Sequence, residues 1–240
     1  MTTQLLIYRS AVPVNQAIHA DCSVETGTNY AFSAGVNSVP LMAVEFPQAA
    51  NELAIVFGGS GTEITPAAIL GLRDGENLLL ERDGSWRGTY IPAFLRRYPF
   101  VFSRAEAERF VLCIDETWPG FNREGRGERL FGADGSVAPY LENIVNFLRE
   151  YQLQFVNTQR FCARVLALGL LEPMQAQVTV DGGTQLSLGG FMAVSRDRLK
   201  ALPGETLAEL AKTDDLELIY LHLHSLRHFD ALRGRLGGVG

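Results

Sequence analysis

The sequence predicts an α+β fold in which an antiparallel β-sheet, drawn mainly from the N-terminal half, packs with helices from the C-terminal half. Short apolar runs separated by glycine-containing turns fill the first half, whereas apolar residues recur with helical spacing from Val137 onwards. A late pair of alternating segments within 175–194 adds a hairpin. Because strands and helices do not alternate regularly, a doubly wound parallel sheet is disfavoured.

The early strands are predicted by apolar runs that end at turn-forming residues. The run LAIVF within 51–57 is followed by the glycine-rich segment 58–61, and Asp-Gly pairs follow at 74–75 and 83–84. Asp-Gly tolerates the backbone angles of tight hairpins, so we expect a small antiparallel meander over 69–86. The segment 58–61 lacks the Gly-Lys-Ser/Thr ending of a phosphate-binding loop and is interpreted as a turn.

Helical spacing governs the second half. A helix with one buried face is predicted from 137 to 155 by apolar residues at i, i+3, i+4 and i+7, namely Tyr140, Leu141, Ile144, Phe147, Leu148, Tyr151 and Phe155. The pattern continues to Leu168 after an interruption or cap at Asn157 or Thr158, so two packed helices and one kinked helix fit equally well. Shorter helices are expected from a cap at Ser195 to Leu202 and over 206–211 and 214–232.

The predicted hairpin pairs 175–180 with 186–194 around the turn 181–184. The sequence leaves open whether this hairpin joins the early sheet or forms its own layer. In YIPAFLRRYPF (90–100), two prolines restrict Ile91 and Tyr98 to extended backbone, with room for one helical turn between them.

We treat residues 1–240 as a single domain with a soft seam at 115–135, between a β-rich part and a helix-rich part. The seam is charged and rich in glycine, yet it carries Trp118, Phe121, Leu130 and Phe131. Four large apolar side chains are too many for a solvated linker, so we expect an ordered loop packed over the core.

Charge and hydropathy exclude several classes of protein. The net charge of -6 carries no Lys/Arg stripe, which argues against a nucleic-acid partner. No apolar stretch is long enough to span a membrane, and the first residues do not resemble a secretory signal, so we expect a soluble, cytoplasmic protein without membrane insertion. The cysteines Cys22, Cys113 and Cys162 are far apart and are expected to be reduced and largely buried.

A ligand-binding site is predicted where arginines adjoin aromatic residues. Guanidinium groups pair with carboxylates or phosphates and stack on aromatic rings. The predicted site residues are Trp86, Tyr90, Arg96, Arg97 and Tyr98. In the alternative interpretation, the arginine pair neutralises Glu81, Asp83 or Glu106 at the rim of the sheet.

Histidines near the C-terminus are weak candidates for metal binding. On one helix, His224 and His228 would share a face, whereas His222 would point away, so a carboxylate from elsewhere would have to complete the site. A helix end enriched in His and Arg to suit the helix dipole explains the same residues. We therefore predict no metal, and the sequence identifies no cofactor.

Two acidic residues follow the apolar run FVLCI. Neighbouring residues on a strand point to opposite faces, so Asp115 and Glu116 are not expected to act together as an acid and a base. Either could bind a cation or an amine singly, and a solvated turn is the alternative. The sequence identifies no catalytic residue.

Several segments, in order along nearly the whole chain, resemble the bacterial SapC family. They are GENLLLERDGSW (75–86), YIPAFLRRYPF (90–100), CIDE (113–116), GERLF (127–131), LGGFMAVSRDRLKAL (188–202) and LELIYLHLHSLRHFD (216–230). The family name implies an association with surface layers, by a non-standard export route. The resemblance also implies genes nearby for TonB-dependent receptors and halogenase-like flavoproteins.

Three hypotheses follow for the function. The first is a non-enzymatic binding or accessory protein that acts with such an uptake or flavoprotein system through protein or peptide recognition, as aromatic-rich extended segments suggest. The second is an enzyme whose site is assembled from dispersed residues and could depend on a metal. The third is a structural component of a surface layer, which would self-assemble.

Overall fold

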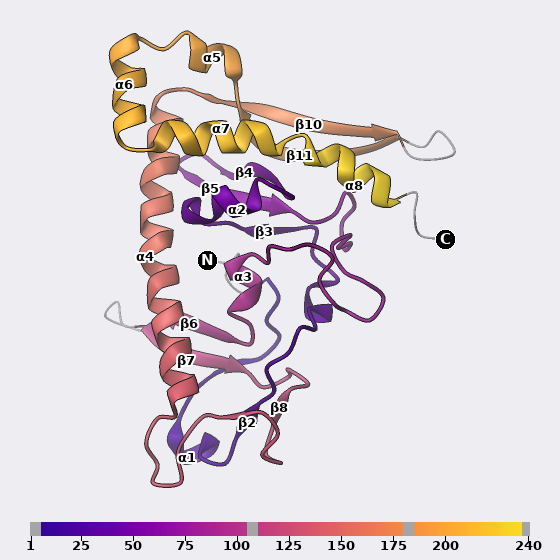
Figure 1. The fold of residues 1–240 in the computed structure, drawn as a ribbon, viewed down its shortest axis with the longest axis vertical. Helices are drawn as coiled ribbons and strands as arrows, with labels where there is room; N and C mark the ends of the chain where they lie inside the picture. Colours follow the sequence, from indigo (N-terminus) through magenta and orange to yellow (C-terminus); the bar gives the residue numbers. More distant parts are fainter. Residues whose placement is uncertain (1–5, 105–109, 180–184, 237–240) are drawn as a thin grey trace. The chain divides into compact units, whose positions relative to one another are not determined.

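Antiparallel sheets and helices make up the chain in the computed structural model, which describes residues 6–104, 110–179 and 185–236, and the longer helices come from the C-terminal half (Figure 1). The predicted α+β class is confirmed. The chain divides into two compact units: unit 1 comprises Met1–Asn29 and Leu95–Leu153, and unit 2 comprises Tyr30–Phe94 and Gln154–Gly240. The predicted seam at 115–135 lies within unit 1.

Unit 1 contains two small antiparallel sheets. The first has the order β1-β7-β6, and the second has the order β8-β2-β9. The strands are β1 (Ala11–Pro13), β2 (Ser23–Val24), β6 (Phe100–Arg104), β7 (Phe110–Asp115), β8 (Phe121–Asn122) and β9 (Glu128–Arg129). The short helix α1 (Gln16–His19) belongs to this unit, as do the first residues of α4 (Pro139–Ala167).

The core of unit 1 joins strands, the seam and helix α4. Its buried residues are Cys22, Val24, Phe100, Phe102, Ile114, Leu130, Phe131, Leu141 and Leu148. Trp118 and Phe121 pack against this cluster. The segment 115–135 is thus packed against the core, with Leu130 and Phe131 buried and Trp118 and Phe121 partly buried, but it contains β8 and β9 and is not a loop throughout.

Unit 2 is built on one five-stranded antiparallel sheet. Its order is β10-β11-β4-β5-β3, with β3 (Ser38–Pro40), β4 (Ala54–Ser60), β5 (Glu63–Ile69), β10 (Leu171–Thr179) and β11 (Gln185–Val194). The predicted late hairpin is confirmed, and Thr179 pairs with Gln185 at its far end. The turn itself, at 181–184, lies outside the described residues. The hairpin joins the early sheet, because Phe191 pairs with Gly58 and Met192 with Phe57.

A turn does follow the LAIVF run, but it comes later than predicted, because 58–60 belong to strand β4. Strand β4 continues through the glycines to Ser60, which pairs with Glu63 on β5. Gly61 lies in this turn with φ of 60°, a backbone conformation that favours glycine. The glycine-rich segment therefore closes a hairpin.

The meander predicted over 69–86 is wrong. Strand β5 ends at Ile69, and between there and 92 the backbone pairing is limited to an isolated bridge between Leu80 and Trp86. The Asp-Gly turns do form, with φ of 74° at Gly75 and 84° at Gly84. The segments around these turns make single backbone hydrogen bonds, such as Leu78 N–H to the Leu70 carbonyl, and Leu78 and Leu79 are buried.

Helix α4 is one continuous helix, which decides between the alternatives left open by the sequence. Thr158 does not interrupt it, because its hydroxyl donates to the Gln154 carbonyl at 2.7 Å within the helix. The same oxygen accepts from the backbone N–H of Ala43 at 2.8 Å. A residue suspected as a break thus attaches the second part of α4 to the short 3-10 helix Ala43–Glu45, which precedes α2 (Phe46–Ala49).

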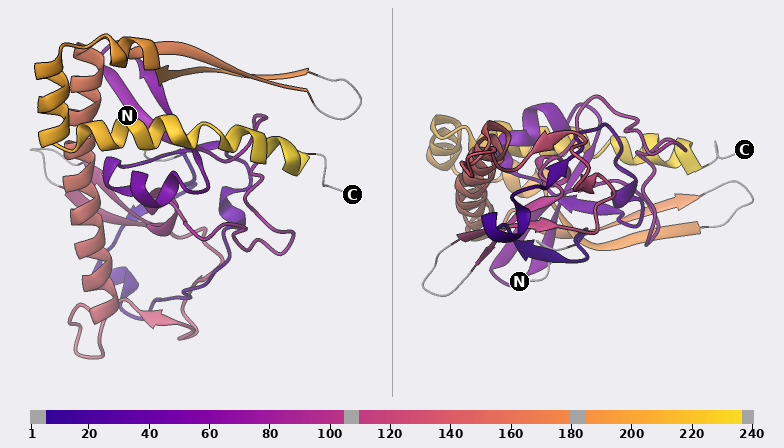
Figure 2. Two further views of the ribbon diagram at one scale, coloured as in Figure 1. Left: turned by 45° about the horizontal axis from the view of Figure 1, so that its top comes forward. Right: turned by 90° about the horizontal axis from the view of Figure 1, so that it is seen from below.

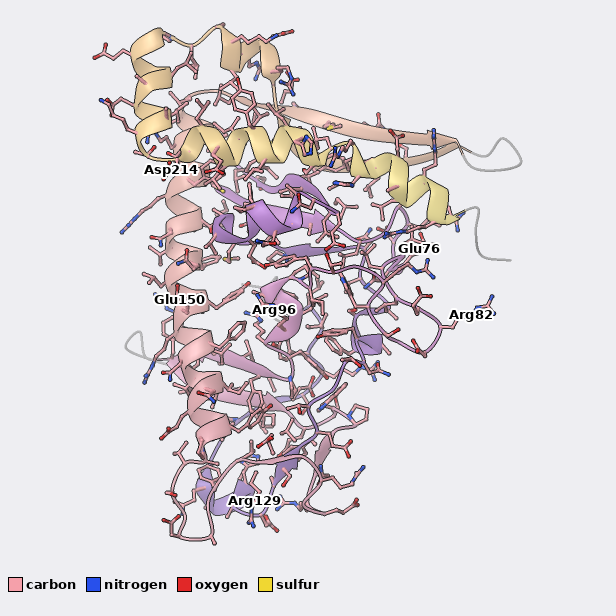
Figure 3. The ribbon with its side chains drawn as sticks, viewed as in Figure 1. Glu76, Arg82, Arg96, Arg129, Glu150 and Asp214 are labelled. Atoms are coloured by element: carbon pink, nitrogen blue, oxygen red, sulfur yellow. The ribbon has the colours of Figure 1, made fainter. Side chains whose placement is uncertain are left out.

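The remaining helices are α3 (Ala93–Arg96), α5 (Arg196–Lys200), α6 (Gly204–Lys212), α7 (Asp215–Ser225) and α8 (His228–Leu236). The single turn predicted between the two prolines is α3. Ser195 occupies the predicted cap position before α5, but its side chain makes no capping hydrogen bond. Asp214 lies at the turn between α6 and α7 (Figure 3). Helix α7 packs against β4 and β11 (Figure 2). Within the described ranges, no helix has both the length and the apolar character needed to cross a membrane.

Candidate functional site

Two of the predicted ligand residues, Trp86 and Tyr90, lie together in unit 2. The Trp86 indole Nε1 donates to the Tyr90 carbonyl at 2.9 Å. The ring of Trp86 meets that of Tyr30 edge-on, with centroids 6.0 Å apart. Both predicted residues are half-buried. Their relative position is therefore fixed by a local hydrogen bond, and part of each ring remains accessible.

Two carboxylates hold the segment that carries these aromatic residues. Glu45, which is 5% exposed, accepts from the Tyr90 hydroxyl at 2.6 Å and from the Ala93 N–H at 2.7 Å. Glu52 accepts from the Thr89 N–H and hydroxyl, both at 2.8 Å, and from the Tyr90 N–H. Sequence reasoning missed both glutamates, because each lies more than 35 positions from its partners.

The other predicted ligand residues, Arg96, Arg97 and Tyr98, lie in unit 1. Arg97 is 2% exposed, and its guanidinium lies over the rings of Tyr8 and Tyr151, at 5.7 and 4.8 Å from their centroids. Arg96 is exposed and lies 5.4 Å from the Phe147 ring centroid (Figure 3). Adjacent arginines thus differ in surroundings, and the five predicted residues are divided between the two units.

The alternative interpretation supposed that the arginine pair neutralises Glu81, but that carboxylate has a different partner. The Glu81 carboxylate instead forms two hydrogen bonds of 2.8 Å with the guanidinium of Arg87. Asp83 accepts from the N–H and the hydroxyl of Ser85. Glu106 lies outside the described residues.

Asp115 and Glu116 have different partners. Asp115 is fully buried and accepts from the backbone N–H groups of Arg9 at 2.7 Å and Ser10 at 3.2 Å, and from the Thr117 hydroxyl at 2.7 Å. Burial raises the pKa of Asp115, but these hydrogen bonds outweigh it and bring the pKa below its usual value. This carboxylate organises the chain around it and has no free face for a substrate.

Glu116 accepts from Nε2 of His19 at 3.0 Å. The other ring nitrogen, Nδ1, lies 3.0 Å from the Asn15 backbone nitrogen and 3.1 Å from the Asn15 carbonyl oxygen. His19 is fully buried, whereas the Glu116 side chain is about one-third exposed. Sequence reasoning missed His19, which lies 97 positions from its partner.

The three C-terminal histidines are also separated. His222 is buried, with Nε2 accepting from the Val194 N–H at 3.0 Å and Nδ1 donating to the Ile55 carbonyl at 2.8 Å. Burial lowers the pKa of His222 to about 4. His228 donates to the Ala50 carbonyl at 3.0 Å, and its pKa is lowered by burial. His224 is exposed.

The single-helix geometry on which the metal hypothesis relied is wrong, because α7 ends at Ser225 and α8 begins at His228. His224 and His228 therefore belong to different helices. Among the residues that the structure describes, no group of three or more His, Cys, Asp or Glu side chains gathers as metal ligands would.

A shallow depression of about 470 Å³ lies in unit 2 beside helix α7. It is lined by Arg196, Glu217, Tyr220, Leu221 and His224. Four of these residues come from α7 with spacings of i, i+3, i+4 and i+7, which place them on one face of the helix. Arg196 begins α5, directly after the end of β11. Sequence reasoning identified only His224 in this group.

The β10–β11 hairpin provides a second accessible surface in unit 2. Its pairing with β4 is limited to Phe191 and Met192, so the remainder of the hairpin projects past β4 (Figure 1). On its other side, β10 has no neighbouring strand among the described residues. From Pro173 to Ser195 the chain contains one charged residue, Asp181. An extended strand edge with so few charges is uncommon in a protein that keeps its sheet edges unpaired.

No curated protein and no solved structure matches the chain. A family model described as SapC matches residues 14–232 of 240, and this stretch includes most of both units, the residues that line the depression, and strands β10 and β11. The chain therefore belongs to the SapC family.

Proposed function

We propose that this protein is a non-enzymatic binding protein that receives an extended peptide segment of a partner protein along the free edge of β10. The observation that carries the proposal is the unpaired edge of this nine-residue strand, Leu171–Thr179, among the described residues. In strand addition, main-chain hydrogen bonds supply affinity, and side chains on alternate positions supply specificity.

The composition of the hairpin supports this role. Natural proteins protect free edges with Lys and other charged residues, with proline, or with a bulge. β10 has Pro173 and an irregular register between Met174 and Ala176, both near the base of the hairpin. Beyond them, Gln175 to Thr179 contains no charge. The distal half of the edge therefore lacks the usual protection and is suited to pairing.

The same composition defines the partner segment. A charged residue placed opposite these uncharged positions would lose hydration without gaining an ion pair. We therefore propose that the segment is extended and uncharged over about five residues, the length of the unprotected edge. The partner is a component of a TonB-dependent uptake or halogenase-like flavoprotein system, the context implied by the family resemblance.

In this proposal the predicted ligand residues supplement the β10 edge, either as accessible side chains or by holding such a side chain in place. Trp86 and Tyr90 supply half-buried rings in unit 2, and Arg96 supplies an exposed guanidinium in unit 1. Arg97 and Tyr98 act behind Arg96, by fixing the chain that carries it. Tyr98 is held within unit 1 by its hydroxyl, which donates to the Asp115 carboxylate at 3.4 Å, and by an edge-on contact with the Trp118 ring.

Site-specific photocrosslinking in the native cell tests the proposal. A benzophenone amino acid replaces Gln175, which is exposed on β10, and the matched control replaces Lys212, which is exposed on α6. We expect crosslinks at 175 to an uncharged segment of one protein and none to that protein at 212. A synthetic peptide of that segment should then slow amide hydrogen exchange in 175–179.

Three outcomes would overturn the proposal. Crosslinks at 175 to a second copy of the chain would identify a self-association edge. Unchanged amide exchange in β10 with bound peptide would place the peptide elsewhere. Turnover of a small metabolite by the purified protein would instead favour an enzyme with a dispersed site.

A further inference from the structure

The depression beside α7 combines three kinds of chemistry in about 470 Å³, a volume within the usual range for small-ligand sites. Arg196 contributes a guanidinium and His224 an imidazole, both of which can donate to an anion. Glu217 contributes a carboxylate. Tyr220, which is 47% exposed, and Leu221 lie between Glu217 and His224 in α7 and contribute an apolar wall.

The charged side chains of this depression have no hydrogen bond or ion pair with other described residues, and Arg196 and Glu217 do not pair with each other. Some other charged residues of unit 2 do form ion pairs: Arg164 pairs with Asp215 at 2.9 Å, and Lys212 with Glu209 at 2.7 Å. The polar groups lining the depression are therefore available to a ligand.

The helix sets the distance between the acidic and basic ends. Glu217 and His224 are seven residues apart on α7, which corresponds to about 10 Å along the helix axis. An extended chain advances about 3.3 Å for each residue, so three residues span the same distance. The Glu217 carboxylate and the His224 imidazole are thus separated along the helix by about the length of a tripeptide.

We propose that this depression binds a short zwitterionic peptide of about three residues. Its terminal ammonium group pairs with Glu217, and its terminal carboxylate is held by Arg196 with His224. An apolar or aromatic central side chain packs against Tyr220 and Leu221. This site is separate from the β10 edge, and the proposal does not rest on strand addition there.

Calorimetric titration of the full chain with Ala-Phe-Ala tests this inference. We expect binding by the peptide with free ends and at least roughly tenfold weaker binding when either end is capped, because each cap removes a charge-assisted hydrogen bond. Glu217→Gln should weaken binding of the free peptide to a similar extent. Glu217→Gln should have no further effect on binding of the N-acetylated peptide, which already lacks the charged ammonium group. This result would identify Glu217 as the partner of that group.

Arg196→Gln tests the carboxylate end in the same way. It should weaken binding of the free peptide and have no further effect on binding of the C-amidated peptide. Lys200→Gln is the matched control, because Lys200 is an exposed cation on the same helix α5 but does not line the depression. All three side chains are exposed, so these variants should fold, as circular dichroism would verify. No binding at millimolar peptide, equal binding of capped and free peptides, or an equal loss with Lys200→Gln would overturn the proposal.

Discussion

The imidazole of His222 accepts a hydrogen bond from the backbone N–H of Val194 at 3.0 Å, and so joins helix α7 to strand β11. Its other nitrogen donates to the carbonyl of Ile55 on β4 at 2.8 Å. One buried side chain therefore connects the two strands through which the late hairpin joins the early sheet. This contact adds to a strand pairing that is limited to two residue pairs.

Replacement of this histidine should destabilise unit 2. In His222→Leu, the Val194 N–H and the Ile55 carbonyl lose their partners inside the core, and we expect a loss of about 3 kcal/mol in the free energy of unfolding. Urea unfolding followed by circular dichroism measures this loss. His224→Leu, an exposed position on the same helix, is the control and should change stability by less than about 0.5 kcal/mol. Equal losses in both variants would contradict the prediction.

The same residue predicts a pH dependence of stability. The pKa of His222 is about 4 in the folded chain, against a usual value of 6.5, because burial disfavours the charged ring. The unfolded chain therefore binds the proton first as the pH falls. The stabilisation is complete above pH 6.5 and is lost between pH 6.5 and 4, with a decrease of about 2 kcal/mol by pH 5.

Unfolding of the native chain and of His222→Gln at pH 7 and pH 5 measures this difference. Glutamine does not titrate, so the variant should lose less stability over the same interval. An identical pH dependence in both proteins would assign the effect to other groups.

The two adjacent arginines should differ in their tolerance of lysine. Arg97 is buried over two tyrosine rings, and lysine lacks the planar group that stacks on them. We expect Arg97→Lys to lower the free energy of unfolding by about 2 kcal/mol, and Arg96→Lys, at an exposed position, to have little effect. Guanidinium chloride unfolding measures both. A larger loss at Arg96 would contradict the assigned packing.

The buried carboxylate of Asp115 should support unit 1 at all but strongly acidic pH. Its pKa lies below the usual value, so its contribution is complete above the unfolded pKa and is lost as the pH falls through the folded pKa. Asp115→Asn should cost about 2 kcal/mol at pH 7, because an amide is a weaker acceptor for the Arg9 and Ser10 N–H groups. Glu116→Gln keeps an acceptor for His19 and is the control. Acid titration of stability should be shallower in Asp115→Asn than in the control.

The cysteines should react with thiol reagents only when the chain opens. Burial raises the pKa of Cys162 to about 12 and also raises the pKa values of Cys22 and Cys113. Since the thiolate is the reactive form, a disulfide reagent at pH 8 should label the native chain slowly. Labelling should accelerate with urea in parallel with unfolding. Rapid reaction of one thiol in the absence of urea would disprove its burial.

Local patterns in the sequence were sufficient where an element depends on its own residues. The apolar spacing from Tyr140 onwards predicted α4, since a helix buries one face at a fixed period. The Asp-Gly pairs predicted turns at Gly75 and Gly84. The strands expected between those turns did not form, because a ladder also needs a partner of matching length, and local patterns do not specify one.

The candidate sites depended much more on long-range contacts. The sequence drew attention to Asp115 and His222, but their partners at Arg9 and Val194 are distant in the chain. It named His224, whereas Arg196 and Glu217 entered the same depression only through packing of α5 and α7 near β11. The group of Trp86, Tyr90, Arg96, Arg97 and Tyr98 is contiguous in sequence, yet the boundary between the units divides it.

The sequence by itself determined the α+β class, the long helix, the existence of the late hairpin and the family resemblance, because periodicity, turn chemistry and short motifs are properties of neighbouring residues. Only the tertiary structure decided that the hairpin joins the early sheet, that β10 has no second strand beside it in the part of the chain that the structure describes, and that an arginine and a glutamate line one depression. These features arise from contacts between residues far apart in the chain, whose formation depends on how all the buried faces are satisfied together.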